Sequence, residues 1–103
     1  MGRVFIAQIY MLTTEEGGRN HPALSGWRPL FSVSERENWS ISVGRPDEQI
    51  FELGQSYEVE LRFIFDDPLG GHPEIGPGSQ FKINEGRRTS ARGEIIRRVL
   101  EEE

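Results

Sequence analysis

The sequence contains no cysteine, only two methionines, and no apolar run long enough to cross a membrane. Without cysteine the chain cannot form disulfides, use a thiol nucleophile or bind metals through thiolates, which suits a reducing compartment. The most apolar stretch, VFIAQIYML at residues 4–12, is about half as long as the ~18 residues of a membrane helix. No small-residue cleavage site follows it, and the Met-Gly start lacks the Ser or Thr of a myristoylation signal. We therefore expect no membrane attachment and a cytoplasmic location.

Charge is distributed unevenly along the chain. The formal net charge is −5, which disfavours broad affinity for nucleic acids or membranes. The stretch from Lys82 to Arg98 is nevertheless basic, with only Glu85 and Glu94 as acids. Its basic residues are Lys82, Arg87, Arg88, Arg92, Arg97 and Arg98. We interpret the stretch as a solvated strand face, with a partner-binding basic face as the alternative.

Alternating apolar residues predict an all-β barrel or sandwich. The clearest alternation runs over 57–65, typical of a strand with one buried and one wet face. Residues 4–12 are largely apolar on both faces. Further strands are predicted at 29–33, 39–43, 80–83 and 87–99, and the apolar residues at 50–53 precede a turn at Gly54-Gln55. We expect one domain over 1–103, with a core at 4–99 and an acidic tail at 100–103.

One window allows a different interpretation. Residues 92–103 place apolar side chains at spacings that also fit an amphipathic helix. We prefer a strand to Val99, because Asn84-Glu85-Gly86 predicts a hairpin turn in which Gly86 takes a positive φ. Gly93 then predicts a bend or bulge in the last strand.

Two long segments rich in glycine and proline predict loops. The stretch GGRNHPALSGWRPLF at 17–31 is too long for a tight turn, and loops of this length tend to be functional. Residues 66–78 contain three prolines and four glycines.

Two separated blocks resemble the third, C-terminal domain of bacterial elongation factor Tu. IYMLTTEEGGRNHPALSGWRPLF is similar to that family's strand followed by a GGRHTPF-like loop and GYRPQFY, and FKINEGRRTSARGEII is similar to FAIREGGRTVGAGVV. The first block matches at Gly17, Gly18, Arg19, Pro22, Gly26, Arg28, Pro29 and Phe31. The second matches at Phe81, Ile83, Glu85, Gly86, Arg88, Thr89, Gly93 and Ile95.

The resemblance covers the chain from about Val4 to Val99 and implies a closed six-stranded antiparallel barrel. In the family this domain contacts the T-stem backbone of aminoacyl-tRNA, the GTPase domain and the nucleotide-exchange factor. The sequence has no GxxxxGK[ST] loop, so it cannot bind GTP in the family's way. We expect a non-catalytic module that binds a protein, such as a translation factor, with binding to the tRNA or RNA backbone through a basic face as the alternative.

The residues expected to meet a partner protein or RNA lie in the two matching blocks. They are Arg19, Asn20, His21, Trp27, Arg28, Arg87, Arg88 and Arg92. Three positions depart from the family and weaken the expected tRNA contact: Asn20 replaces a histidine, Leu30 a glutamine and Arg87 a glycine.

Two of these residues also have structural interpretations. For Arg28 we favour a buried or half-buried side chain that pairs with Glu15, Glu16 or Glu85. For Trp27 we favour packing over one end of the core.

The sequence predicts no catalytic, cofactor or metal site. His21 and His72 are the only histidines, and they occupy separate loops. An enzymatic or metal site would require both to converge with Asp66, Asp67 or Glu74.

A homodimer is a further interpretation. A barrel that resembles one domain of a larger protein has apolar surface to cover, and the apolar side chains of the first strand are candidates for it. The candidate residues are Phe5, Ile9 and Met11.

Overall fold

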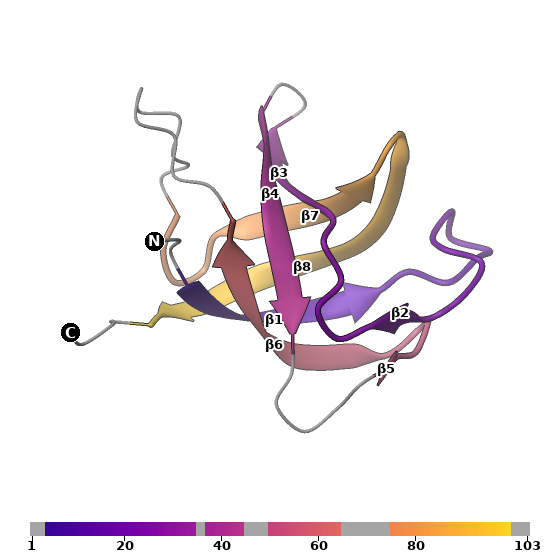
Figure 1. The fold of residues 1–103 in the computed structure, drawn as a ribbon, viewed down its shortest axis with the longest axis horizontal. Helices are drawn as coiled ribbons and strands as arrows, with labels where there is room; N and C mark the ends of the chain where they lie inside the picture. Colours follow the sequence, from indigo (N-terminus) through magenta and orange to yellow (C-terminus); the bar gives the residue numbers. More distant parts are fainter. Residues whose placement is uncertain (1–3, 35–36, 45–49, 65–74, 100–103) are drawn as a thin grey trace.

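The computed structural model describes residues 4–34, 37–44, 50–64 and 75–99, and these form eight strands and no helix. Six strands close into one barrel, in the order β1-β6-β4-β3-β7-β8, with β1 also paired to β8 (Figure 1). Every pairing is antiparallel. The predicted closed six-stranded antiparallel barrel is therefore confirmed. The strands are β1 (Val4–Met11), β2 (Ala23–Leu24), β3 (Leu30–Ser34), β4 (Glu37–Gly44), β5 (Ile50–Phe51), β6 (Ser56–Phe63), β7 (Gln80–Glu85) and β8 (Arg88–Arg98).

The alternation predicted over 57–65 is confirmed in β6, where Val59, Leu61 and Phe63 are buried and their neighbours Glu58 and Arg62 are exposed. This is the pattern of a strand whose side chains point alternately into the barrel and into solvent.

Within the described residues there is no helix that could span a membrane.

Phenylalanine rings fill the barrel interior. The Phe31 ring stacks on Phe81, with 4.8 Å between centroids, and meets Phe63 edge to face at 5.0 Å. Phe5 packs on the other side of Phe63 at 5.8 Å. Edge-to-face and offset contacts of this kind stabilise a core beyond the area they bury. Phe31 contacts two of the other rings and is fully buried.

The apolar residues of β1 lie inside the barrel. Phe5, Ile9 and Met11 are at most 1% exposed, so the prediction that they mark an exposed dimer surface is wrong. The reason is closure: β1 pairs with β6 on one side and β8 on the other, and the period of two sends these side chains inward. A homodimer remains a prediction without these residues.

The apolar segment at 50–53 contains a short strand, β5, that does not join the barrel. β5 pairs only with β2, which lies within the loop predicted at 17–31, and the two form a small ribbon beside the barrel (Figure 1). Ala23 and Phe51 are buried, whereas their neighbours Leu24 and Ile50 are exposed. The ribbon therefore fastens the middle of the loop to the core.

The β7–β8 hairpin differs from the predicted one by a shift along the chain. β7 continues through Glu85, so the turn consists of Gly86, with φ of +62°, and Arg87. β8 continues to Arg98, which rules out the helix over the described part of 92–103. The acidic tail at 100–103 and most of the 66–78 loop lie outside the described residues.

The irregularities of β8 lie on either side of Gly93 and not at it. Against β7, Ser90 is an extra residue, and against β1, Ile96 is extra. Gly93 sits where an added Cβ would lie 2.4 Å from the Gln8 carbonyl oxygen. Glycine is thus required there because β8 approaches β1 closely.

We expect Phe31→Ala to lower the free energy of unfolding by about 3–5 kcal/mol, because it leaves a cavity between two rings. Urea denaturation at neutral pH measures the change. Val33→Ala on the same strand is the control, since Val33 is 40% exposed and its truncation should cost less than about 0.5 kcal/mol. Equal effects at the two positions would contradict this view of the core.

Candidate partner-binding site

The Glu85 carboxylate at the end of β7 joins three segments of the chain. Its Oε2 accepts hydrogen bonds from Arg19 Nη1 at 2.5 Å and from the Trp27 indole Nε1 at 3.0 Å. Its Oε1 accepts a hydrogen bond from the Ser90 hydroxyl at 2.5 Å. Arg19 and Trp27 belong to the 17–31 loop and Ser90 to β8, so one carboxylate ties the loop to the hairpin. We call Arg19, Trp27, Glu85 and Ser90 the Glu85 cluster.

A β-bulge places Ser90 in this cluster. Ile83 pairs with Ala91 and Asn84 pairs with Thr89, which leaves Ser90 without an opposite residue. Both Ser90 and Ala91 are fully buried, although consecutive strand residues normally face opposite sides. The bulge thus turns the Ser90 hydroxyl toward Glu85, an example of a bulge re-aiming a side chain.

Arg19 and Trp27 contact each other as well as Glu85. The guanidinium carbon of Arg19 lies 5.4 Å from the centroid of the Trp27 ring, a cation–π distance. Arg19 Nε also donates to the His21 carbonyl at 2.9 Å. Trp27 packs against the core, as predicted, and its carbonyl accepts a hydrogen bond from the Val43 N–H of β4 at 2.8 Å.

The pKa of Glu85 lies below the ordinary value of 4.5 for a glutamate. Partial burial of the carboxyl raises its pKa, but the hydrogen bonds from Ser90, Trp27 and Arg19, together with the Arg19 charge, outweigh that effect. Folding therefore favours the ionised form. The resulting stability is complete above the ordinary pKa and is lost as the pH falls through the lower, folded-state pKa.

The loop leaves β1 through a second small network. Glu16 Oε1 accepts hydrogen bonds from the Tyr10 hydroxyl at 2.7 Å and from the Thr13 N–H at 2.9 Å. The Thr13 hydrogen bond, then the Tyr10 hydrogen bond, lower the pKa of Glu16, whereas the hydrogen bond to Glu16 raises the pKa of Tyr10. The Thr13 carbonyl accepts from the N–H groups of Glu16 and Gly18, which closes the turn at the start of the loop.

Gly18 has no room for a side chain. An added Cβ would lie 2.5 Å from the carbonyl oxygen of Leu12 and 2.8 Å from its Cβ. The loop therefore packs directly on the chain that leaves β1, and this close approach positions Arg19 for Glu85.

The structure corrects the interpretation of Arg28. Arg28 is exposed, and the arginine that pairs with Glu85 is Arg19. Glu16, another acid proposed as a partner of Arg28, accepts hydrogen bonds from Tyr10 and Thr13. Arg28 follows Trp27, which turns inward to the core, and the neighbouring side chain consequently faces solvent.

The other predicted site residues are exposed and divide between two places. Asn20 and His21 follow Arg19 on the loop, while Arg87 and Arg88 lie at the hairpin turn next to Glu85. The Glu85 cluster thus brings the loop and the hairpin together. We call the exposed residues Asn20, His21, Arg87 and Arg88 the loop–hairpin face. Arg92 is farther along β8, with its guanidinium carbon 5.3 Å from the centroid of the Tyr10 ring.

Sequence reasoning missed the roles of Glu85 and Ser90. As a side-chain partner, Glu85 is indicated by the sequence only for Arg28, and no role is indicated for Ser90. The signal that could have found them is a glutamate at the end of a strand and a serine five residues later, but only the register shift at Ser90 brings the two side chains together.

Within the described residues, no group of three or more His, Asp or Glu side chains could hold a metal ion. His72, Asp66, Asp67 and Glu74 lie outside the described residues, so the absence of a metal or catalytic site stays a prediction.

A scan against models of known protein families finds none that matches this chain. The fold therefore defines the class as a small closed antiparallel β-barrel, and membership in the family of elongation factor Tu stays a hypothesis based on the two sequence blocks.

We expect Glu85→Gln to lower the free energy of unfolding by about 1–3 kcal/mol at pH 7, since hydrogen bonds to a charged group are the stronger kind. The difference from the unmodified protein should shrink as the pH falls below about 4.5, because Glu85 itself becomes protonated there. Urea denaturation at pH 7 and near pH 3 measures this. Glu58→Gln, at an exposed position of β6, is the control at pH 7. A difference that does not change with pH would show that the charge of Glu85 is unimportant.

Gly18→Ala should destabilise the protein by about 1–3 kcal/mol, because the added methyl group overlaps the Leu12 backbone. Gly76→Ala is a matched control: an added Cβ there has nothing within 4 Å and the glycine φ is not positive. Its effect should lie between neutral and a gain of about 1 kcal/mol. Thermal unfolding compares the two variants, and equal stabilities would refute the close approach at Gly18.

Proposed function

We propose that this chain is a non-catalytic protein-binding module of the cytoplasm, resembling the third domain of elongation factor Tu and linked to translation. The observation that carries the proposal is the Glu85 cluster. An ion pair, an indole hydrogen bond and a cation–π contact hold the start and the end of a surface loop. Between them the loop exposes Asn20 and His21, whose side chains contribute nothing to the core.

Binding of a protein partner fits the physical character of this loop. Functional residues are commonly carried by loops on a rigid scaffold. The Glu85 cluster holds the loop against the hairpin before any partner arrives, so little conformational entropy is lost when the complex forms. Among the described strands, the closed barrel offers no free edge and the β2–β5 ribbon has edges of only two residues, so we expect a partner to be recognised mainly through side chains and loops.

The proposed link to translation rests on the sequence resemblance. Three of the matching residues, Gly18, Arg19 and Glu85, are structural residues of the site in this chain. The resemblance therefore concerns a coherent structural unit and not scattered identities. This supports descent from a partner-binding domain. The proposal includes no enzymatic activity.

RNA-backbone binding is the alternative, and one observation favours it. Arg87, Arg88 and Arg92 are all exposed on the same hairpin, as phosphate contacts would require. Two observations make it the weaker proposal. The Arg19 guanidinium is paired with Glu85, and the net charge of −5 opposes a polyanion.

The test is affinity capture from a lysate, with and without ribonuclease, followed by reconstitution with the purified captured protein. We expect capture of a specific protein, such as a translation factor, that survives ribonuclease. The variant Asn20→Ala/His21→Ala/Arg87→Gln/Arg88→Gln should weaken binding at least about tenfold, or about 1.4 kcal/mol.

Arg97→Gln/Arg98→Gln is the control for charge, because it removes two exposed arginines of β8 that lie far along the strand from the turn. It should bind as the unmodified protein does. Capture that disappears with ribonuclease would favour the RNA alternative, and capture of no specific protein would refute the proposed function.

A further inference from the structure

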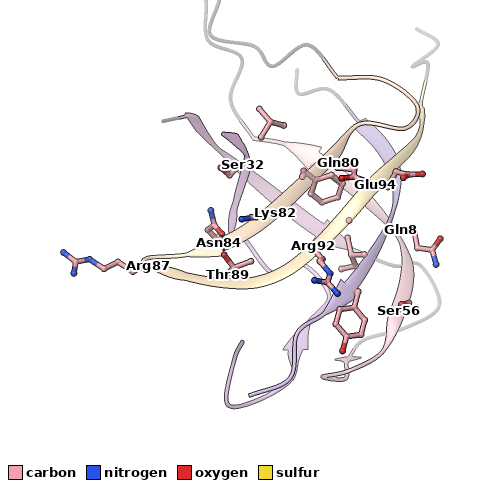
Figure 2. A pocket seen from close by; sticks show the side chains of 15 residues that line it. Gln8, Ser32, Ser56, Gln80, Lys82, Asn84, Arg87, Thr89, Arg92 and Glu94 are labelled. Atoms are coloured by element: carbon pink, nitrogen blue, oxygen red, sulfur yellow. Dashed lines mark hydrogen bonds between the residues drawn. The ribbon is translucent and has the colours of Figure 1, made fainter. Parts of the chain in front are cut away.

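Residues of β1, β3, β6, β7 and β8 line a hollow of about 980 Å³ on the wall of the barrel (Figure 2). It adjoins the loop–hairpin face at Arg87, which lines the edge of the hollow and extends outward from the tip of the hairpin (Figure 2). The lining contains both polar and apolar residues.

Two cations lie directly opposite each other in this hollow. Lys82 of β7 pairs in register with Arg92 of β8, and both are exposed. Like charges at opposed positions of neighbouring strands destabilise a sheet. Among the described residues, neither side chain forms an ion pair or a hydrogen bond with a carboxylate. Arg92 instead lies over the Tyr10 ring.

Among the described residues, no acid forms an ion pair with Lys82 or Arg92. The Glu16 carboxylate interacts electrostatically with Arg92, but it already accepts hydrogen bonds from Tyr10 and Thr13. An anion supplied from outside would relieve the repulsion between Lys82 and Arg92 and would find two adjacent donors.

The neighbouring row of side chains has the opposite character. Glu94 lies two residues from Arg92 on β8 and is flanked in register by Gln8 of β1 and Gln80 of β7. The hollow therefore presents a pair of cations and, about 6.6–6.8 Å farther along the strands, a carboxylate between two amides.

This arrangement distinguishes between two kinds of anionic partner. A nucleic acid carries negative charge at every phosphate. A phosphate next to the one bound by Lys82 and Arg92 would therefore be repelled by the Glu94 carboxylate. In an extended peptide, residues two positions apart also lie about 6.6–6.8 Å from each other. Such a peptide can therefore present an acid to Lys82 and Arg92 and a hydrogen-bond donor to Glu94. Because the barrel has no free edge, such a peptide would bind through its side chains and not as an added strand.

We propose that this hollow binds an extended segment of a partner protein in which an acidic residue and a basic or amide residue are two positions apart. The inference rests on the proposed protein-binding function and names the partner chemistry for one surface of the barrel. Binding should therefore depend on the spacing of the two peptide residues as well as on their charge.

The test is an NMR titration of the ¹⁵N-labelled full chain with two synthetic peptides of equal composition. One repeats Glu-Ser-Lys-Ser, which contains the proposed spacing in both directions, and the other repeats Glu-Lys-Ser-Ser, in which no Glu and Lys are two positions apart. We expect the first to shift the amide signals of Lys82, Arg92 and Glu94, with a dissociation constant in the range of about 1 mM. The second should bind at least about threefold more weakly.

Variants test the residues of the hollow. Lys82→Gln/Arg92→Gln should weaken binding of the first peptide at least about tenfold, without loss of thermal stability, because the substitution removes a repulsion. Arg97→Gln/Arg98→Gln, the same change of charge on β8 outside the hollow, should leave binding within about twofold of the unmodified protein. An increase in thermal stability of Lys82→Gln/Arg92→Gln at low salt would support the repulsion itself.

Three outcomes would overturn the inference: equal binding of both peptides, unchanged binding in Lys82→Gln/Arg92→Gln, or tighter binding of a short single-stranded RNA to the same residues. The titration needs no cellular partner, so its failure is separate from that of the capture experiment. If Lys82→Gln/Arg92→Gln still captures the same protein from lysate and no peptide binds, the proposed function stands and this inference fails.

Discussion

The pairing of β1 with β8 is the constraint on which the rest of the structure depends. These are the first and last strands of the barrel, and their hydrogen bonds turn a six-stranded sheet into a closed one. Closure decides which side of every strand is inside, and it buries the whole inward face of β1. It also leaves no unpaired barrel edge, so recognition must occur through loops and outward side chains.

The site exists because the ladder between β7 and β8 is imperfect. In a regular hairpin Ser90 and Ala91 would face opposite sides, but the bulge buries both and directs the Ser90 hydroxyl to Glu85. The same carboxylate then receives the guanidinium and the indole of the loop. A local defect in the barrel wall thus becomes the anchor of its longest described loop.

The β7–β8 hairpin serves both proposed surfaces, and the two have different physical bases. The loop–hairpin face depends on the Glu85 cluster, which has its charges paired internally. The hollow depends on Lys82 and Arg92, two cations at opposite positions of neighbouring strands that form no ion pair within the described structure. An acidic chain that gathers exposed cations on one hairpin concentrates its attraction for anionic groups there, while the net charge of −5 disfavours binding elsewhere.

The sequence by itself determined the all-β class, the alternation of β6, the positive φ of Gly86 and the presence of a long loop before β3, because each depends on neighbours within a few residues. Tertiary structure alone decided which arginine meets Glu85, that β5 pairs with β2, and that Phe5, Ile9 and Met11 lie inside. These outcomes depend on strand register and closure. An extra residue at Ser90 or Ile96 changes which side chains face each other without changing the local pattern of apolar residues.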